Sequence, residues 1–427
     1  MIKKQIEEIE KQLLLSKETH LQNEEDLKNY EITNIKLNDS LINMEKKNKR
    51  MEDEIEEGKK EYNIESNEYI KNIIIYTTKK HPETRCYLTA NYSKLKKSII
   101  VVGGTTSKCE QYNFITSFNP KTNKWDFYDY SGELFDVEIT GHSCNIVNQN
   151  KQEQLFIFGG FNSVNDNYTT NSYLISIQNM NFNQVDIRKN SKGLTEYPSR
   201  RSYHTSNYDK ENNVIYIYGG TDMNISNSKN INFQSIWEFD LNRKCWDIIK
   251  INNPPVNGVP RGHSSILFNN KLYIFGGVIL FKKFTNCLYT IDLTCKEIEF
   301  LKYEGNVNPV AFHSAVLISN KSFIIQGGLD KNYNVIKDCY IYNFERNCFN
   351  KINIPLIPKV FGHKLSFNEE ERKVYIVGGM DNFKYVGDEN LIYQPENMNE
   401  DLFEQNEEEL VFYPMKQIFE MELKEDI

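Results

Sequence analysis

Six pairs of consecutive glycines divide most of this chain into repeats, and they constrain its fold more than any other feature. Successive pairs begin 56, 60, 57, 51 and 51 residues apart, and each follows an apolar run such as SIIVV, VIYIY or KLYIF. Such runs predict strands buried on both faces. Glycine suits a chain that leaves a strand through a positive φ or passes close to a neighbouring backbone. The pairs are Gly103 and Gly104, Gly159 and Gly160, Gly219 and Gly220, Gly276 and Gly277, Gly327 and Gly328, and Gly378 and Gly379.

A hairpin is predicted after each diglycine. Two of these hairpins contain tryptophan: seven residues separate Phe118 from Trp125, and seven separate Phe239 from Trp246. Turn-forming Asn, Pro and Asp lie between the large residues, which we expect on paired strands that fill the space between neighbouring sheets. In four repeats the first large residue stands 14 positions after the second glycine, at Phe118, Ile291, Tyr342 and Tyr393.

A third position recurs 13 to 17 residues before each diglycine. It holds five of the seven histidines, and Tyr87 is assigned to it in the first repeat. A strand follows this position each time, so each repeat is predicted to contain four strands. The histidines are His142, His204, His263, His313 and His363.

These three motifs in phase resemble the kelch repeat family, whose pattern runs from a Pro-Arg and His region through an apolar strand and diglycine to a Tyr-Asp and Trp hairpin. PRGHSSILFNNKLYIFGG at 260–277 follows that pattern closely. The resemblance covers about residues 66–395. It implies a mainly β fold, a six-bladed β-propeller of four-stranded antiparallel blades.

The sixth repeat lacks a large apolar residue seven positions after Tyr393, where Glu400 stands. Another segment must complete this blade, because an open ring leaves vulnerable sheet edges. We expect YIKNIIIYTT at 69–78 to supply its outer strand. The competing segment is ELVFYPMK at 409–416.

The N-terminal region is predicted to form a long coiled-coil helix. Residues 2–57 contain no proline or glycine, and ten of the sixteen a and d positions counted from Ile6 are apolar. A parallel dimer is the first choice, and a single solvated helix or one packed on the rest of the chain is the alternative. The predicted domains are therefore 1–65, the coiled coil, and 66–427, the propeller with an acidic segment at 396–409.

Composition limits the partners. Lys and Arg total 51 against 59 Asp and Glu, so the net charge of −8 gives no global indication of nucleic acid or anionic membrane binding. No apolar run approaches the roughly 20 residues of a membrane span, and the N-terminus lacks a secretory pattern. The eight cysteines contain no CxxC pair and are expected to be reduced thiols. We therefore expect a cytoplasmic protein.

The five phased histidines invite a metal hypothesis, but repeats arranged in a ring spread these side chains apart, whereas metal ligands converge on one ion. We expect them to hydrogen-bond between blades. No HExxH, P-loop or GxSxG motif occurs. The sequence therefore predicts no catalytic residue, no metal site and no cofactor.

Binding residues are expected in the loops that follow the diglycines, which should emerge on one face and differ from blade to blade. The resemblance to kelch-type ligase adaptors implies that arginines near blade starts hold acidic peptide motifs, and guanidinium groups suit carboxylates. Lys282 and Lys283 would extend a basic region that is one-sided, since other blades carry Thr140, Ala311 and Phe361. The candidates are Arg85, Arg201, Arg261, Phe161, Tyr168, Phe233, Phe281, Lys282, Lys283, Phe284, Tyr333, Phe383 and Tyr385.

The sequence thus favours a non-enzymatic scaffold or adaptor, in which a coiled-coil dimer presents two propellers to partner proteins. One alternative is a substrate receptor of a ubiquitin ligase, recruited indirectly because the first 65 residues leave no room for a BTB or F-box domain. The other is an enzyme with its site at the propeller mouth.

Overall fold

The computed structural model describes residues 58–64, 67–78, 80–106, 115–128, 139–149, 152–162, 167–180, 182–222, 231–255, 258–279, 282–354, 356–381 and 417–424. This part of the chain is mainly β, and its helix is the single turn α3 (Ile231–Gln234). No helix within these ranges is long and apolar enough to cross a bilayer. The coiled coil predicted for residues 1–65 falls mostly outside the described residues.

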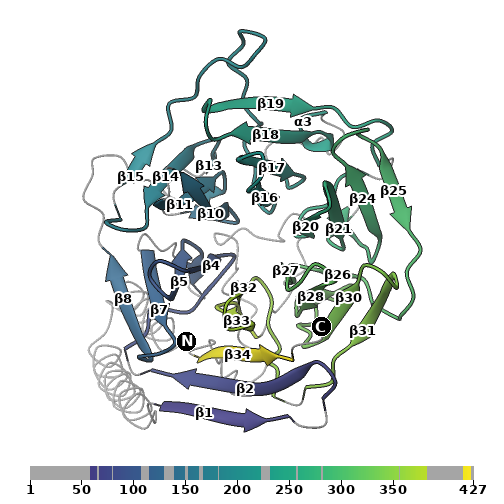
Figure 1. The fold of residues 1–427 in the computed structure, drawn as a ribbon. Helices are drawn as coiled ribbons and strands as arrows, with labels where there is room; N and C mark the ends of the chain where they lie inside the picture. The colour runs from purple at the N-terminus through teal and green to yellow at the C-terminus, as the bar shows by residue number, and fades with distance from the viewer. Residues whose placement is uncertain are drawn as a thin grey trace, which may run out of the picture.

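Six sheets of four or five antiparallel strands are arranged around a common axis (Figure 1). We number these sheets as blades one to six, with the first-named strand of each nearest the axis. Blade one contains β4 (Thr89–Ser93), β5 (Ser98–Val102), β7 (Ile115–Asn119) and β8 (Lys124–Tyr128). Blade two contains β10 (Ser143–Gln149), β11 (Gln152–Phe158), β14 (Ser172–Ser176) and β15 (Phe182–Gln184). Blade three contains β16 (Thr205–Asp209), β17 (Val214–Tyr218), β18 (Ile236–Asp240) and β19 (Cys245–Ile249).

The later blades repeat this order. Blade four contains β20 (Ser264–Phe268), β21 (Lys271–Phe275), β24 (Leu288–Asp292) and β25 (Ile298–Leu301). Blade five contains β27 (Ser314–Leu317), β28 (Ser322–Gln326), β30 (Cys339–Asn343) and β31 (Cys348–Lys351). Blade six contains β32 (Lys364–Asn368), β33 (Lys373–Val377), β34 (Gln417–Leu423), β2 (Ile70–Thr77) and β1 (Gly58–Asn63).

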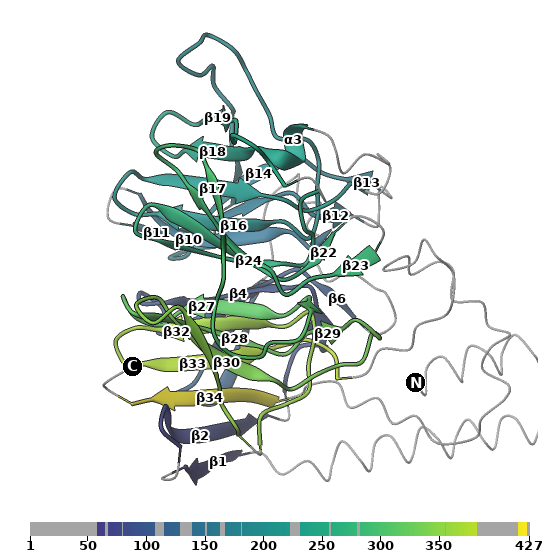
Figure 2. The same ribbon diagram turned by 90° about the vertical axis from the view of Figure 1, so that its right-hand side faces the viewer.

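Short strands gather at one end of the ring, on what we call the mouth face (Figure 2). Three pairs join the segment before a blade to the segment after its diglycine, for example Arg85 with Thr106, and two pairs lie within the segment after a diglycine, for example Val278 with Phe284. The diglycines therefore end their strands at the mouth face, and the turns between first and second strands lie at the opposite end. These short strands are β3 (Arg85–Cys86), β6 (Thr105–Thr106), β9 (Ile139–Thr140), β12 (Phe161–Asn162), β13 (Asn167–Tyr168), β22 (Val278–Ile279), β23 (Lys283–Phe284), β26 (Val310–Ala311) and β29 (Leu329–Asp330).

The strand register confirms the predicted hairpins. Phe118 pairs directly with Trp125, and Phe239 pairs with Trp246. Trp246 is fully buried and packs against Phe156 and Phe158 of the preceding blade. The large residues therefore fill the space between blades, as aromatic residues with a large buried area do in protein cores.

The diglycines lie where the backbone of one blade contacts the next. Gly276 has a φ of +67°, and a Cβ atom there would lie 2.6 Å from the carbonyl oxygen of Val310 and 2.8 Å from Cε1 of His313. The amide of Gly277 donates to the same Val310 carbonyl at 2.8 Å. A side chain at Gly276 would therefore be strained by both conformation and contact.

Blade six is assembled from three distant segments (Figure 1). Its third strand is β34, which pairs with β33 from Lys373 to Ile376. The prediction that the third strand of this blade contains Tyr393 is therefore wrong. Tyr393 itself lies outside the described residues. β2 takes the next position outward, which was predicted for 69–78; the competing segment 409–416 is outside the described residues.

A fifth strand, β1, pairs with β2 along its full length, from Gly58 with Thr77 to Asn63 with Asn72. These residues were predicted to be the end of the coiled-coil helix. They form a strand instead because the apolar side chains of β2 are already buried against blades five and one, and β1 satisfies the backbone groups on its outer edge. The sheet therefore begins at residue 58, before the predicted domain boundary at 66.

Candidate functional site

The floor of the mouth face is a closed ring of six backbone hydrogen bonds around the axis. The six residues alternate between aromatic residues and glycine, and each amide donates to the carbonyl of the residue before it at 2.6 to 3.0 Å. In order they are Tyr87, Gly141, Tyr203, Gly262, Phe312 and Gly362, one from each blade. This ring ties all six blades together at one level.

Tyr87, Tyr203 and Phe312, which we call the aromatic triad, meet over the axis. Their ring centroids are 5.0 to 5.4 Å apart and all three pairs are edge-to-face. Each has a positive φ of 55° or 56°, which is strained for a bulky residue. A Cβ at Gly262 would lie 2.7 Å from Phe312, so the glycines make room for the rings. The sequence interpretation missed this triad, although the alternation of aromatic residues with glycine was its signal.

The five repeated histidines are buried and neutral. Burial lowers the pKa of His142, His263, His313 and His363 to about 3, and lowers that of His204 well below its usual value. Nε2 of His313 lies 2.8 Å from the hydroxyl of Ser264 on the preceding blade. Equivalent contacts join His142 to Thr89, His204 to Ser143 and His263 to Thr205. Within the described ranges, no group of three or more His, Cys, Asp or Glu side chains is placed to hold a metal ion.

In the first repeat the histidine position was assigned to Tyr87, and this assignment is wrong by one residue. The glycine of the preceding blade identifies the equivalent side chain: a Cβ at Gly276 would touch His313, whereas one at Gly378 would touch Leu88. Leu88 therefore takes the histidine position, and Tyr87 takes the axial position of the triad. The first repeat has no histidine in RCYL, so the sequence did not indicate which of Tyr87 and Leu88 occupies the histidine position.

Arg85 and Arg201 do not open onto the mouth, contrary to prediction. Both are almost fully buried. Arg85 donates to the carbonyl of Gly103 at 2.9 Å and to the hydroxyl of Thr116 at 3.0 Å. Arg201 donates to the carbonyls of Gly219 and Ser199 and stacks 4.6 Å from the Phe233 ring, which is also buried. Burial lowers the pKa of Arg201 to about 9, so it stays charged near neutrality.

A one-residue offset explains this difference from Arg261. Arg85 and Arg201 stand three residues before Leu88 and His204, at the position that holds buried Ile139, Val310 and Val360 in other blades. Arg261 stands two residues before His263. Successive residues of an extended chain point to opposite sides, so half-buried Arg261 faces the other side of the chain from Arg85 and Arg201.

The remaining candidates divide by exposure. Phe284 is buried and contacts the Tyr333 ring edge-on at 5.3 Å. Phe161 and Tyr168 are half-buried and form a second edge-on pair at 5.2 Å. Lys283 is exposed, and Arg261, Lys282 and Tyr333 are half-buried. Phe281, Phe383 and Tyr385 lie outside the described residues.

Arg261 and Lys282 each have a side-chain nitrogen that is shielded from solvent and lacks a hydrogen-bond partner within the described ranges. These atoms are Nε of Arg261 and Nζ of Lys282. Burial lowers the pKa of Arg261, and the groups that oppose this shift are Tyr203, Tyr168, Tyr333 and Tyr87 rather than carboxylates. By contrast Arg200, which the sequence interpretation overlooked, is paired with Asp222 at 2.7 Å. This arrangement offers hydrogen-bond donors and positive charge to an acidic group.

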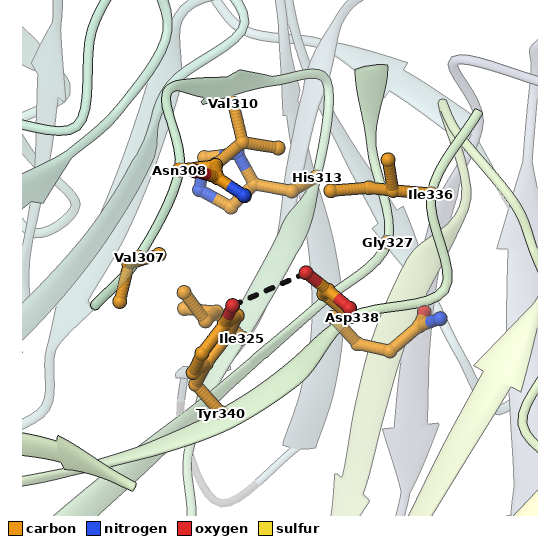
Figure 3. Close-up of a pocket in the computed structure, with 10 residues that line it drawn as sticks. Val307, Asn308, Val310, His313, Ile325, Gly327, Ile336, Asp338 and Tyr340 are labelled. Atoms are coloured by element: carbon orange, nitrogen blue, oxygen red, sulfur yellow. Dashed lines mark hydrogen bonds between the residues drawn. The ribbon is translucent and has the colours of Figure 1, made fainter. Parts of the chain in front are cut away.

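A small cavity lies beside His313, near the diglycine of blade five (Figure 3). Val307, Val310, Ile325 and Ile336 supply apolar walls, and the hydroxyl of Tyr340 donates to Asp338 at 3.1 Å. Asp338 is also paired with Lys351 at 2.7 Å. The cavity has room for about one water molecule, so it is too small for an organic substrate.

Comparison with known families decides the classification. The family model described as the KLHDC2/KLHL20/DRC7 Kelch-repeats domain matches residues 141–379, which is more than half of the chain. The chain belongs to this Kelch-repeat family. Kelch-repeat domains are generally interaction domains that bind proteins, and the homologues below suggest the same for this chain.

Relatives match shorter stretches. Kelch domain-containing protein 3 from Bos taurus is 24% identical over 187 residues, 42% of this chain and 44% of the relative; the same protein from Homo sapiens gives the same values. Host cell factor homolog hcf-1 from Caenorhabditis elegans is 30% identical over 149 residues, 32% of this chain and 18% of the relative. The chain thus spans less than half the length of these relatives.

Proposed function

We propose that this chain is a non-enzymatic scaffold or adaptor, built on a six-bladed propeller whose mouth face binds a partner protein. The observation that carries the proposal is the pair of shielded cations, Arg261 and Lys282, which have no acidic partner within the described ranges. They stand beside half-buried Tyr168 and Tyr333, and aromatic and arginine side chains are enriched at binding hot spots.

The partner would present an acidic motif. A carboxylate between Arg261 and Lys282 would receive charge-assisted hydrogen bonds, which are about twice as strong as neutral ones. Exposed Lys283 would strengthen the attraction at long range. The aromatic triad beneath these residues gives the peptide a rigid floor, which reduces the entropy cost of binding.

The proposal includes self-association through the heptads of residues 1–57 and a cytoplasmic location. A parallel coiled coil would place two mouth faces in one assembly and increase avidity for a partner with two motifs. The first 57 residues are the part of the predicted coiled coil that precedes β1.

Affinity capture with quantitative mass spectrometry tests the mouth face. The full chain is compared with a mouth variant, Arg261→Ala, Lys282→Ala and Lys283→Ala. The matched control is Lys210→Ala, Lys296→Ala and Lys321→Ala, which removes three exposed lysines from turns at the opposite end of the ring. We expect a specific set of partners to fall at least tenfold with the mouth variant and to persist with the control.

Partners that are retained by the mouth variant but lost when residues 1–57 are deleted would contradict the proposal, because recognition would then lie in the N-terminal region. Circular dichroism of each variant separates loss of binding from loss of fold.

A further inference from the structure

The second and third strands of blade six are joined by residues 382–416, which lie outside the described residues. β33 ends at its diglycine on the mouth face, and Met380 then pairs with the segment that precedes the blade. β34 runs antiparallel to β33, with Phe419 opposite Ile376, so Gln417 lies at the same end of the sheet (Figure 2). Both points of attachment of 382–416 are therefore at the mouth face.

This connection contains the acidic segment, residues 396–409. Seven of its residues are Glu or Asp, and none is Lys, Arg or His. The segment contributes −7 of the net charge of −8, so the rest of the chain is almost neutral. Most of the excess negative charge of the protein is thus attached to the mouth face.

The mouth face holds cations that such a segment would neutralise. Arg261 and Lys282 each have a shielded nitrogen without a hydrogen bond, and neither side chain forms an ion pair with a described residue. Two carboxylates of the described mouth are engaged elsewhere, since Asp222 pairs with Arg200 at 2.7 Å and Asp330 accepts amides of its own turn. A shielded cation without a counter-charge is costly. An anionic group from beyond the described residues would remove that cost.

One apolar cluster brings these cations close to the start of the connection. Met380 of blade six packs in the same cluster as Val278 and Phe284 of blade four. The backbones of Arg261 and Val278 exchange two hydrogen bonds, of 2.9 and 3.0 Å. Lys282 lies in the hairpin that pairs Val278 with Phe284. Both cations are therefore adjacent to the cluster that contains Met380.

The length of chain on each side of the acidic segment permits a contact with these cations. Fifteen residue steps separate Asp381 from Glu396, and eight separate Glu409 from Gln417. An extended chain covers about 3.3 Å per residue, so the two connections span up to about 50 Å and about 26 Å. Blades four and six are joined at the axis through Phe312 alone, by hydrogen bonds of 2.7 and 2.9 Å. The segment can therefore reach from blade six to blade four.

We propose that residues 396–409 bind, within the same chain, to Arg261 and Lys282 and compete there with the acidic motif of the partner. This inference rests on the proposed function, because it concerns regulation of the same surface. A segment on a short connection acts at an effective concentration of about 1 mM, so even a weak contact would occupy the site. The apparent affinity for a partner would fall in proportion to the fraction of chains whose site is unoccupied.

A fluorescein-labelled peptide of residues 394–411 tests the contact without any partner. The peptide is titrated into a full chain whose acidic segment is neutralised, and binding is followed by fluorescence anisotropy. We expect one site, and we expect the unaltered chain to bind the peptide at least about tenfold more weakly, because its own segment competes. The neutralised chain carries Glu396→Gln, Glu400→Gln, Asp401→Asn, Glu404→Gln, Glu407→Gln, Glu408→Gln and Glu409→Gln.

Two further sets of variants separate the site from general charge. Arg261→Ala with Lys282→Ala, added to the neutralised chain, should abolish peptide binding, whereas Lys210→Ala with Lys321→Ala, at the opposite end of the ring, should not. A control chain neutralised near its N-terminus has the same net charge as the neutralised chain. It should bind the peptide as weakly as the unaltered chain does. Its substitutions are Glu7→Gln, Glu8→Gln, Glu10→Gln, Glu18→Gln, Glu24→Gln, Glu25→Gln and Asp26→Asn.

The inference is overturned if the peptide does not bind the neutralised chain, or if the N-terminal control binds it equally well. It is also overturned if loss of Arg261 and Lys282 leaves peptide binding unchanged. Should that double variant not fold, as judged by circular dichroism, Lys282→Gln alone decides, and an unchanged affinity would count against the site. A difference between unaltered and neutralised chains that grows with chain concentration would assign the competing segment to a second copy and contradict the intramolecular contact.

The peptide test and the partner capture fail separately. Peptide binding that requires Arg261 and Lys282, without any captured partner that requires them, would support this inference and contradict the proposed function. Capture of such a partner together with no peptide binding would overturn this inference and leave the proposed function in place.

Discussion

The contact between blades four and five and the contact between blades six and one have the same backbone geometry but different side chains. In the first, Gly277 donates to Val310 at 2.8 Å and Ser264 meets His313 at 2.8 Å. In the second, Gly379 donates to the carbonyl of Arg85 at 2.6 Å, but Leu88 and Lys364 replace the histidine and the serine. The diglycine therefore specifies how blades approach, whereas the polar pair between them is interchangeable.

The two contacts also differ in how the chain reaches them. Blades four and five are consecutive, while blade six combines β32 and β33 with strands from both ends of the described chain. Burial holds these strands together: Ile70, Ile73, Ile74 and Tyr76 of β2 are at most 3% exposed. Glu420 of β34 is fully buried, where it accepts a hydrogen bond from Tyr76 at 2.7 Å and pairs with Lys373 at 3.0 Å.

Removal of β1 and β2 should have the largest effect. Deleting residues 58–77 exposes β34 and removes four buried side chains, each worth about 2 kcal/mol or more. That loss is comparable with a whole domain's stability of about 5 to 15 kcal/mol. We expect no cooperative thermal transition. Deleting residues 1–57 is the control and should leave the transition in place; a cooperative melt without 58–77 would show that the ring closes without β2.

The second-largest effect should come from acid, which destabilises the histidine contacts between blades. A histidine with a pKa of about 6.5 when unfolded and about 3 when folded takes up its proton mainly in the unfolded state. Its stabilisation is complete above pH 6.5 and is lost as the pH falls from 6.5 towards 3, by about 1.4 kcal/mol per pH unit for each histidine. We expect the free energy of unfolding, measured with urea, to fall steeply between pH 6 and pH 4.

Replacing one histidine sharpens this prediction. His313→Leu introduces the residue that blade one already has at this position. It should make the free energy of unfolding depend less steeply on pH, by the contribution of one histidine. An unchanged slope would mean that other groups cause the acid sensitivity.

A substitution at the diglycine should reduce the free energy of unfolding by less than the deletion of β1 and β2 or the protonation of the histidines. Gly276→Ala forces a side chain into a positive φ and against Val310, so we expect the free energy of unfolding to fall by about 3 kcal/mol. Gly58→Ala is the matched control, because nothing lies within 4 Å of its Cβ position. Equal stability of the two variants in urea would show that the close approach at Gly276 is not required.

Surface ion pairs in blade six should matter least. Lys71 and Glu422 join β2 to β34 at 2.9 Å, but the lysine side chain is 60% exposed. Exposed pairs contribute about 0 to 1 kcal/mol, so Lys71→Met should change the free energy of unfolding by less than 1 kcal/mol. A larger loss would mean that charge, rather than burial, holds β2 in place.

Most of the fold could be predicted because its determinants are local and repeated. The diglycines and the seven-residue interval located the second strands and the hairpins, including Phe118 with Trp125. The fixed residue intervals gave a wrong prediction in blade six, where β34 takes the place of the third strand expected at Tyr393. No residue interval specifies which distant segment pairs with β33, because several apolar segments could form hydrogen bonds with the same edge of that strand.

The candidate site was predicted less well, because side-chain direction depends on a single residue of register. Arg85 and Arg201 have the same chemistry as Arg261 but lie one position earlier and point into the core. The triad was missed because its strained backbone becomes meaningful only when Tyr87, Tyr203 and Phe312 meet at the axis. The spacing of the diglycines locates the blades in the sequence, but which side chains meet at the axis depends on how the blades are arranged around it.

Hydrogen exchange of the full chain, with and without a saturating captured partner, tests the proposed function most directly. We expect protection of backbone amides in the segments after the diglycines of blades two, four and five, around Tyr168, Lys282 and Tyr333. The turns at the opposite end, around Lys210 and Lys321, should exchange at an unchanged rate. Protection confined to those turns or to the outer strands would contradict the assignment of recognition to the mouth face.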